Sequence, residues 1–186
     1  VTFDGYDELY DGAAHGLEAE VTGLTGMTIT YSDSATGTFS ATSPEYTDAG
    51  TYTVYFKAVD PDGNYSDATG SAQIIIRKVE VTVTADDRSM TYGDTTTLTP
   101  AEGVTYAGFV NSETSSVVSG TVGYGYFDGA TAVTISNTLP VKTYDITPDV
   151  SGLSATNYTF VPANGTLTVG QARLEVPSAA YDEPSD

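Results

Sequence analysis

Cysteine and tryptophan are absent from this sequence of 186 residues, and basic side chains are few. Without cysteine, the chain has neither a disulfide framework nor a thiolate metal site. Six Lys and Arg stand against 25 Asp and Glu, for a formal net charge of −19. A surface this negative repels nucleic-acid phosphates and anionic lipid headgroups. No apolar run reaches the roughly 18 residues of a membrane span, and no signal peptide is recognised. We therefore expect an excerpt of a larger protein that binds no nucleic acid and inserts into no membrane.

Two stretches of the chain share one pattern. Residues 51–83 and 143–176 each open with a Thr-Tyr pair, continue with an Asn-Tyr pair about one strand and turn later, and end in a β-branched strand. The matching positions are Tyr52 and Tyr144, Asn64 and Asn157, Tyr65 and Tyr158, Ile76 and Val169, and Val79 and Ala172. We interpret each copy as the last hairpin and exit strand of one module, followed by the first strand of the next. The repetition therefore predicts a tandem array.

Residues 1–78 are predicted to be the first module. Short alternating runs at 17–23, 27–33 and 51–59, followed by a strand at 71–78, are separated by Gly, Asp and Asn turns. In the run 51–59, the side chains of Tyr52, Val54, Phe56 and Ala58 share one face, which we assign to the core. About seven short strands without a helix indicate an immunoglobulin-like antiparallel sandwich.

Residues 79–172 are predicted to be the second module, joined to the first without a linker. Tyr92-Gly93-Asp94 takes the place that Tyr10-Asp11-Gly12 holds in the first module. Residues 108–120 are the one helical candidate, with Asn111 or Ser112 as its cap and Glu113 near its N-terminus. Strands are expected at 121–128, 132–136, 143–150, 157–161 and 165–169. A short helix among strand pairs suggests a β-grasp-like module, with a pure sandwich as the alternative.

Residues 173–186 are predicted to be the truncated start of a further repeat, with Tyr181-Asp182 in the tyrosine position. This segment lacks its partner strands. We expect it either to pack as an extra strand on the second module or to be poorly ordered.

The residues also carry a resemblance to known repeats. In the first module the motifs are Tyr10-Asp11-Gly12, Ala14-His15-Gly16 and Asp48-Ala49-Gly50-Thr51-Tyr52. These resemble the YDG-type and related immunoglobulin-like repeats of large bacterial surface proteins. In the second they are Thr91-Tyr92-Gly93-Asp94, Gly108-Phe109-Val110-Asn111, Gly152-Leu153, Ala155, Asn157-Tyr158 and Asn164-Gly165-Thr166-Leu167-Thr168-Val169. These are similar to MBG repeats of the YGX type. The resemblance implies an adhesin of Gram-positive or gut bacteria and supplies no catalytic residues.

An acidic turn between two predicted strands is the candidate metal site. Asp60, Asp62, Asn64 and Asp67 place four oxygen-bearing side chains around Gly63. Ca²⁺ requires several hard oxygen ligands in a flexible loop, so these residues are candidate calcium ligands. The favoured interpretation is an ordinary hairpin turn, because Pro-Asp-Gly-Asn is a common turn sequence and the bidentate Glu of an EF-hand is missing. No other cofactor is expected.

Aromatic side chains provide the candidate ligand site. Tyr124 and Tyr126 lie on one face of a predicted strand, where exposed rings would stack on sugars; the alternative is that they cover cross-strand neighbours. The repeated tyrosines at 52, 144, 65 and 158 are predicted to be structural, with rings in the core and hydroxyls bonded to turns.

Catalysis is not expected. His15 is the only histidine, and the sequence identifies neither a nucleophile nor an orienting acid beside it. Lys57 or Lys142 could form an isopeptide bond with an Asn near an acid, but nothing local marks such a triad.

The function expected from the sequence is that of a non-catalytic stalk. We expect a monomeric repeat fragment of a bacterial cell-surface adhesin, secreted or attached to the cell wall, that holds a binding region away from the cell. The first alternative is that the modules themselves bind host or dietary glycans or mucin through exposed tyrosines and loops. The second is an array stiffened by calcium.

Overall fold

The computed structural model describes residues 1–94 and 103–174. Its two compact units each combine segments distant in the sequence. Unit 1 consists of Val1–Thr82, Tyr106–Thr121 and Val150–Val161, and unit 2 consists of Val83–Thr105, Val122–Asp149 and Pro162–Asp186. Residues 79–82 and two later segments thus group with the first 78 residues, while the proposed module boundary at 78/79 stays a prediction. The predicted start of a further repeat lies outside the described residues from residue 175 onward.

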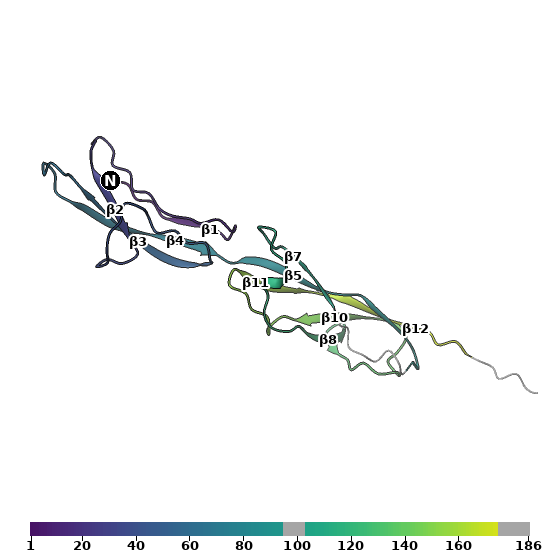
Figure 1. The fold of residues 1–186 in the computed structure, drawn as a ribbon. Coiled ribbons are helices and arrows are strands. Elements are labelled where there is room, and N and C mark those ends of the chain that lie inside the picture. Colours follow the sequence, from purple (N-terminus) through teal and green to yellow (C-terminus); the bar gives the residue numbers. More distant parts are fainter. Residues whose placement is uncertain (95–102, 175–186) are drawn as a thin grey trace, which may run out of the picture. The chain divides into compact units, whose positions relative to one another are not determined.

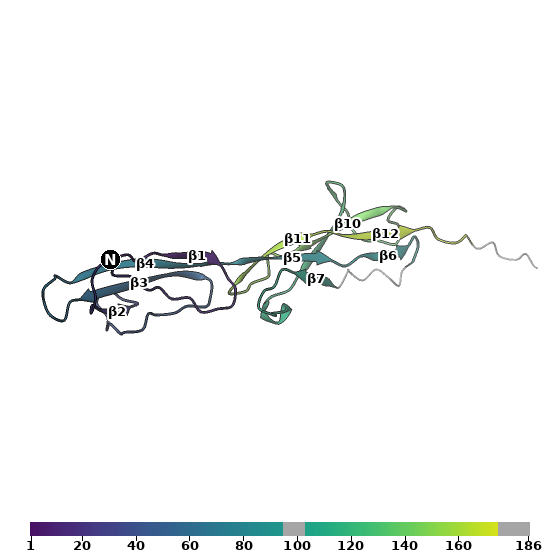
Figure 2. The ribbon, with the colours of Figure 1, turned by 90° about the horizontal axis from the view of Figure 1, so that it is seen from above.

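Unit 1 contains a four-stranded sheet with the order β1-β4-β3-β2 (Figure 1). Its strands are β1 (Tyr6–Leu9), β2 (Thr28–Ser32), β3 (Gly50–Val59) and β4 (Ala68–Arg77). The strands β2, β3 and β4 pair antiparallel, whereas β1 pairs parallel with the end of β4. Figure 2 shows β1, β4 and β3 side by side. The β3–β4 hairpin is the closing hairpin that the sequence repeat predicted.

The alternation along β3 places one face in the core. Val54, Phe56 and Ala58 are buried, and Tyr52 is half-buried. They pack with the β-branched residues of β4, of which Ile74 is fully buried. The face predicted from the period of two is therefore confirmed, because side chains at alternate positions of a strand share one side of the sheet.

A second, three-stranded sheet has the order β11-β5-β7. Its strands are β5 (Val79–Ala85), β7 (Val104–Ala107) and β11 (Tyr158–Ala163). The first residues of β5 and β11 belong to unit 1. There Val81 is fully buried, and Val81 and Tyr158 join the same core cluster as the residues of β3 and β4.

Unit 2 contains a five-stranded sheet with the order β6-β12-β10-β8-β9. Its strands are β6 (Arg88–Thr91), β8 (Gly123–Asp128), β9 (Thr131–Ala132), β10 (Thr143–Asp149) and β12 (Gly165–Gly170). Here too a short strand, β6, pairs parallel with the exit strand β12. Ile146, Leu167 and Val169 are buried in its core, which the half-buried Tyr124 and Tyr126 flank.

The two halves of the repeat have the same local geometry. The Tyr10 N–H donates to the Arg77 carbonyl at 2.8 Å, immediately after the parallel pairing of β1 with β4. The Tyr92 N–H donates to the Gly170 carbonyl at 2.9 Å, immediately after the parallel pairing of β6 with β12. The correspondence of Tyr10 with Tyr92 is therefore structural as well as sequential.

The mainly β fold class is confirmed, but three expected elements differ. Residues 17–23 form no strand: Glu20 makes one β-bridge with Thr2, while the Leu17 and Ala19 N–H groups donate to the side-chain oxygens of Ser43 and Tyr31 rather than to a neighbouring strand. Only Thr131–Ala132 of the region around 132–136 is a strand.

The helix predicted for 108–120 is also reduced, to the single 3₁₀ turn η1 (Ser115–Val117), capped by Thr114. Asn111 and Ser112 cap nothing, because both adopt the left-handed conformation, with φ of 52° and 59°, which interrupts a right-handed helix. The described residues contain no α-helix. The β-grasp-like topology of the second module stays a prediction.

Candidate functional site

A polar arrangement in unit 1 centres on the carboxylate of Glu113. Tyr10, just after β1, donates its hydroxyl to Oε1 of Glu113 at 2.9 Å, and Tyr158, at the start of β11, donates its hydroxyl to Oε2. The two rings meet edge to face with centroids 5.7 Å apart. Both rings are buried, with 5% and 2% of their surfaces exposed. We call Tyr10, Glu113 and Tyr158 the Glu113 cluster; it joins three segments that are far apart in the sequence.

The electrostatics of the Glu113 cluster keep both phenols neutral. Burial, followed by the hydrogen bond to Glu113, raises the pKa of Tyr10. The same two causes raise the pKa of Tyr158 to about 12. A neutral phenol donates a hydrogen bond, whereas a phenolate beside a carboxylate would repel it. At neutral pH both phenol hydroxyls therefore donate to the one carboxylate of Glu113.

Asn157 ties the same region to the loop that precedes β3. Its Oδ1 accepts from the Ala49 N–H at 2.7 Å, and its Nδ2 donates to Oδ1 of Asp48 at 3.0 Å. Its backbone carbonyl accepts from the Val79 N–H at 2.9 Å. Asn157 is only 9% exposed, so these bonds replace water that the side chain has lost. One amide side chain thus fixes two loops 108 residues apart.

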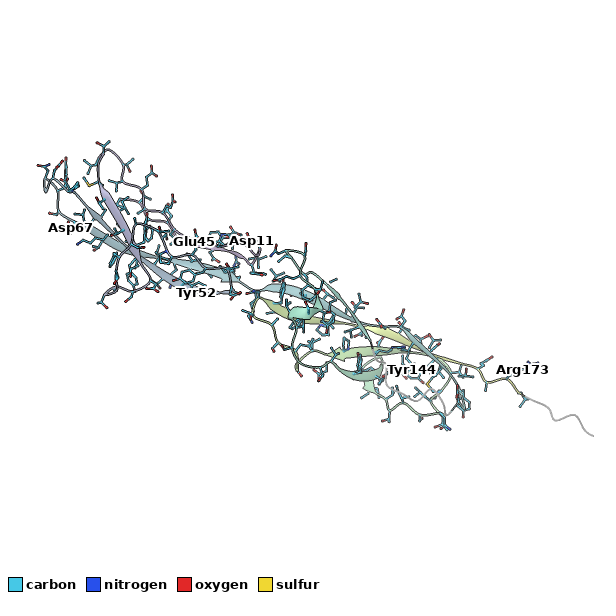
Figure 3. All side chains as sticks on the ribbon, in the orientation of Figure 1. Asp11, Glu45, Tyr52, Asp67, Tyr144 and Arg173 are labelled. Atoms are coloured by element: carbon cyan, nitrogen blue, oxygen red, sulfur yellow. The ribbon has the colours of Figure 1, made fainter. Side chains whose placement is uncertain are left out.

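Two of the repeated tyrosines make the same local bond. Tyr52 donates its hydroxyl to the Asp48 carbonyl at 3.0 Å, and Tyr144 donates to the Pro140 carbonyl at 2.9 Å, each four residues earlier. Figure 3 labels both side chains on their strands β3 and β10. The predicted hydroxyl-to-turn bonds are confirmed here. Tyr65 is different: it is 56% exposed, because it lies in the β3–β4 turn, where residues 61–67 are all exposed. The prediction that its ring lies in the core is wrong.

Tyr124 and Tyr126 lie beside an open groove of about 410 Å³ in unit 2. Phe127 and Ile135 also line this groove. Both tyrosines are half-buried against the core of unit 2, and the hydroxyl of Tyr124 accepts from the Gly103 N–H at 3.1 Å. One side of each ring is therefore committed to packing. The rings lie beside a space that an apolar or sugar surface could enter, and glycan binding there stays a prediction.

The acidic turn between β3 and β4 is organised around Asp60. Its carboxylate accepts from the backbone N–H groups of Asp62, Asn64 and Tyr65 at 3.0, 2.7 and 3.0 Å. Asp67 instead pairs with Lys57 on β3 at 3.0 Å. The local sequence folds as an Asp-initiated turn because one carboxylate satisfies three donors. Across residues 1–94 and 103–174, no three acidic or histidine side chains gather closely enough to hold a metal ion. Calcium binding by these four residues stays a prediction.

His15 stacks on Tyr6 of β1, with ring centroids 4.2 Å apart. Its Nε2 lies 2.9 Å from Oδ1 of Asp11 and 3.2 Å from the hydroxyl of Tyr6. The bond with His15, followed by the Ala13 N–H, lowers the pKa of Asp11. These contacts hold a turn and include no serine or threonine hydroxyl that His15 would activate.

The two lysines considered for crosslinking form exposed ion pairs. Lys57 pairs with Asp67, and Lys142 pairs with Asp128. In both pairs each side chain is more than 40% exposed, so water competes for these partners. The partners are aspartates rather than the asparagine that was considered, and an isopeptide bond stays untested.

The contacts that sequence reasoning missed are those of Glu113 and Tyr10. Glu113 was assigned to a helix N-terminus, whereas it binds two phenols through long-range contacts. The repeated Asn-Tyr pair at 157 and 158 was the one signal for this region, because it predicted fixed structural roles there.

Structural likenesses cover nearly the whole chain at low similarity. One is to the fibronectin(III)-like modules of Clostridium thermocellum CbhA, with 15% identity, a TM-score of 0.25 and coverage of 92% of this chain and 93% of that one. Another is to human protocadherin-24 EC1-2, with 11% identity, a TM-score of 0.28 and coverage of 91% and 95%. The N-terminal four Ig domains of Dscam1 isoform 4.44 give 7% identity, a TM-score of 0.29 and coverage of 89% and 43%. At such TM-scores these structures add nothing to the assignment of a ligand or site.

No curated protein matches the sequence. Within the part of the chain that the structure describes, no helix has the length and apolarity to cross a membrane. The model of the MBG domain (YGX type) matches residues 81–168. The resemblance that the sequence motifs predicted for the second half of the chain is thus confirmed over residues 81–168, which match the MBG domain (YGX type).

Proposed function

We propose that this chain is a non-catalytic structural repeat of a bacterial cell-surface protein, acting as a spacer that presents a binding region carried elsewhere. The observation that supports it best is the pair of ties made by Glu113 and Asn157. Both side chains join segments far apart in the sequence, and their hydrogen-bonding groups point into the protein. These polar contacts are therefore used to hold the fold together.

The MBG match supports this proposal, since repeats of this type occur in surface proteins. The acidic surface supports it as well, because a net charge of −19 keeps neighbouring chains apart and promotes solubility. His15 fits the same proposal, since its partners Asp11 and Tyr6 hold a turn.

Glycan or mucin binding is the second candidate function, and the groove beside Tyr124 and Tyr126 favours it. Its volume of about 410 Å³ lies within the usual range of ligand pockets, roughly 300 to 1,000 Å³. Tyr124, Tyr126 and Phe127 supply aromatic surface along one strand.

A glycan array carrying mucin-type and plant oligosaccharides separates the two functions. The spacer proposal expects no saturable binding by the intact chain. Saturable binding that Tyr124→Ala and Tyr126→Ala abolish, while Tyr65→Ala leaves it intact, would overturn the spacer proposal in favour of the groove. Tyr65 is a suitable control because it is exposed and distant from the groove in sequence.

Thermal unfolding with added Ca²⁺ and with EDTA tests the calcium-stiffened variant. We expect the same melting temperature in both conditions, because the Asp60 carboxylate is already engaged by three backbone donors. A Ca²⁺-dependent rise that Asp60→Asn removes would instead support a metal-bound array.

A further inference from the structure

Through the internal repeat, positions at one end of unit 2 correspond to positions in unit 1. In unit 1 the loop after β1 and the loop before β3 lie at the end of the sheet where the exit strand β4 finishes, and both are covered by later segments of the chain. Tyr10 contacts Glu113 and Tyr158, and Ala49 contacts Asn157. The exit strand then continues into β5, where Val81 is fully buried.

The counterparts of these positions in unit 2 follow from hydrogen bonds. Tyr92 matches Tyr10, because each N–H donates to the end of an exit strand. Pro140 matches Asp48, because each carbonyl accepts the hydroxyl of a tyrosine four residues later. Val141, the residue after Pro140, therefore matches Ala49. The spacing from Ile76 to Val81 equals that from Val169 to Leu174, so Leu174 matches Val81.

All three counterparts in unit 2 are exposed. Tyr92 has 42% of its surface exposed, Val141 45% and Leu174 88%, whereas Tyr10 has 5% and Val81 0%. They share one end of the five-stranded sheet. Tyr92 follows β6, Val141 precedes β10, and Leu174 follows β12, which lies between β6 and β10. The Val169 N–H also donates to the Lys142 carbonyl at 2.9 Å, so the loop before β10 meets the exit strand. We call Tyr92, Val141 and Leu174 the terminal face.

We infer that the terminal face is a docking surface for a further copy of residues 79–172. This inference rests on the proposed function as a structural repeat and names the partner that the terminal face would bind. The copy would supply its own Asn157, whose Oδ1 accepts from the Val141 N–H, as Asn157 accepts from Ala49 here. Its Tyr158 would pack against Tyr92, and its Glu113 would accept the Tyr92 hydroxyl, as both do with Tyr10. Leu174 would enter its core at the position that Val81 fills.

Apolar burial is the driving force expected at this face, and the polar groups fix its register. Large apolar side chains at an exposed sheet end are stabilised by transfer out of water. The asparagine and glutamate partners require one alignment of donors and acceptors, since a shifted copy would leave buried polar groups unpaired. A chain built in this way extends by one module at a time, each module completing the end of the one before.

The test extends the chain by one module. Residues 1–174 are joined to a second copy of residues 82–172, so that Leu174 takes the Val81 position, and amide exchange is compared with that of the 186-residue chain. We expect exchange of the Val141 amide to slow by about tenfold or more, because a new hydrogen bond protects it. Nitration of Tyr92 should fall in parallel. The matched control carries Asn157→Ala in the added copy only, and it should return Val141 to its rate in the unextended chain.

Two results would overturn the inference. The first is an unchanged Val141 amide while the β10 and β12 amides of the added copy are protected, because the copy would then be folded but undocked. The second is an added copy with no protected strands, because the terminal face is inferred to complete its core. Glycan binding by the groove would overturn the spacer function while leaving the exchange of Val141 unaffected, so the two failures are distinguishable.

Discussion

Replacing Asn157 with alanine should destabilise unit 1 by about 2 kcal/mol. The substitution removes the acceptor for the Ala49 N–H and the donor to Asp48. Ala49 is half-buried, so its N–H loses its partner at a cost of about 1 to 3 kcal/mol. Asp48 is exposed, so water replaces the lost donor at little cost. The carbonyl of residue 157 keeps its bond from the Val79 N–H, so the loss comes from the side chain alone.

Thermal unfolding measures this loss directly. For a unit of this size, each kcal/mol lowers the melting temperature by about 4 °C, so Asn157→Ala should lower it by about 8 °C. Exchange of the Ala49 amide should accelerate in the same variant. Asn64→Ala is the matched control, because Asn64 occupies the equivalent repeat position on an exposed turn. Equal melting temperatures for the two variants would refute the assignment of Asn157 as a tie between the loops.

Three further outcomes follow from the structure. Val54→Ala should cost roughly 2 to 3 kcal/mol in urea unfolding, since Val54 is fully buried, while Val161→Ala at a 37% exposed site should cost under about 0.5; equal losses would contradict the core assignment. The pKa of Tyr158 is raised from 10.0 to about 12 in the folded protein, so folding favours its neutral phenol. The stability that this phenol contributes is therefore fully present below pH 10 and is lost as the pH rises toward 12. Tyr158→Phe should flatten the stability profile over that interval, and an unchanged slope would count against this phenol. The pKa of Asp11 is lowered from 3.8 in the folded protein, so its ionised carboxylate contributes stability above pH 3.8 that is lost at more acidic pH. Asp11→Asn should remove this loss of stability in acid. If the loss is retained, the bond with His15 is not its source.

Strands with a clear period of two could be predicted from the sequence. Val54, Phe56 and Ala58 were assigned to the core from alternation alone and are buried there. The strand predicted at residues 17–23 did not form, because alternation indicates one buried face and does not supply a neighbouring strand to pair with. Its one β-bridge is to Thr2, and the Leu17 and Ala19 N–H groups donate to side chains instead. The helix expected at 108–120 failed because Asn111 and Ser112 adopt left-handed backbone angles that composition does not reveal.

The contacts of the candidate site divide in the same way. The hydroxyl bonds of Tyr52 and Tyr144 span four residues, so a repeated Thr-Tyr pair was sufficient to predict them. The bond from Tyr10 to Glu113 spans 103 residues, and no local pattern identifies such a partner. Tyr65 shows the opposite limit: it repeats Tyr158 in sequence but lies on an exposed turn, whereas Tyr158 is buried against Tyr10 and Phe109.

The parallel pairing of β1 with β4 has a consequence for biosynthesis. A chain is made from its N-terminus, so Tyr6–Leu9 must wait for Ile74–Arg77 before its hydrogen bonds form. Closure of the core waits longer still, until Tyr158 has been made. Pairings between segments this far apart slow folding, since the entropy cost of closing a long loop comes before any stabilising contact forms. Nascent chains that stop near residue 80 should therefore remain susceptible to proteases and dependent on chaperones, and protection should arise only after residue 161 has emerged.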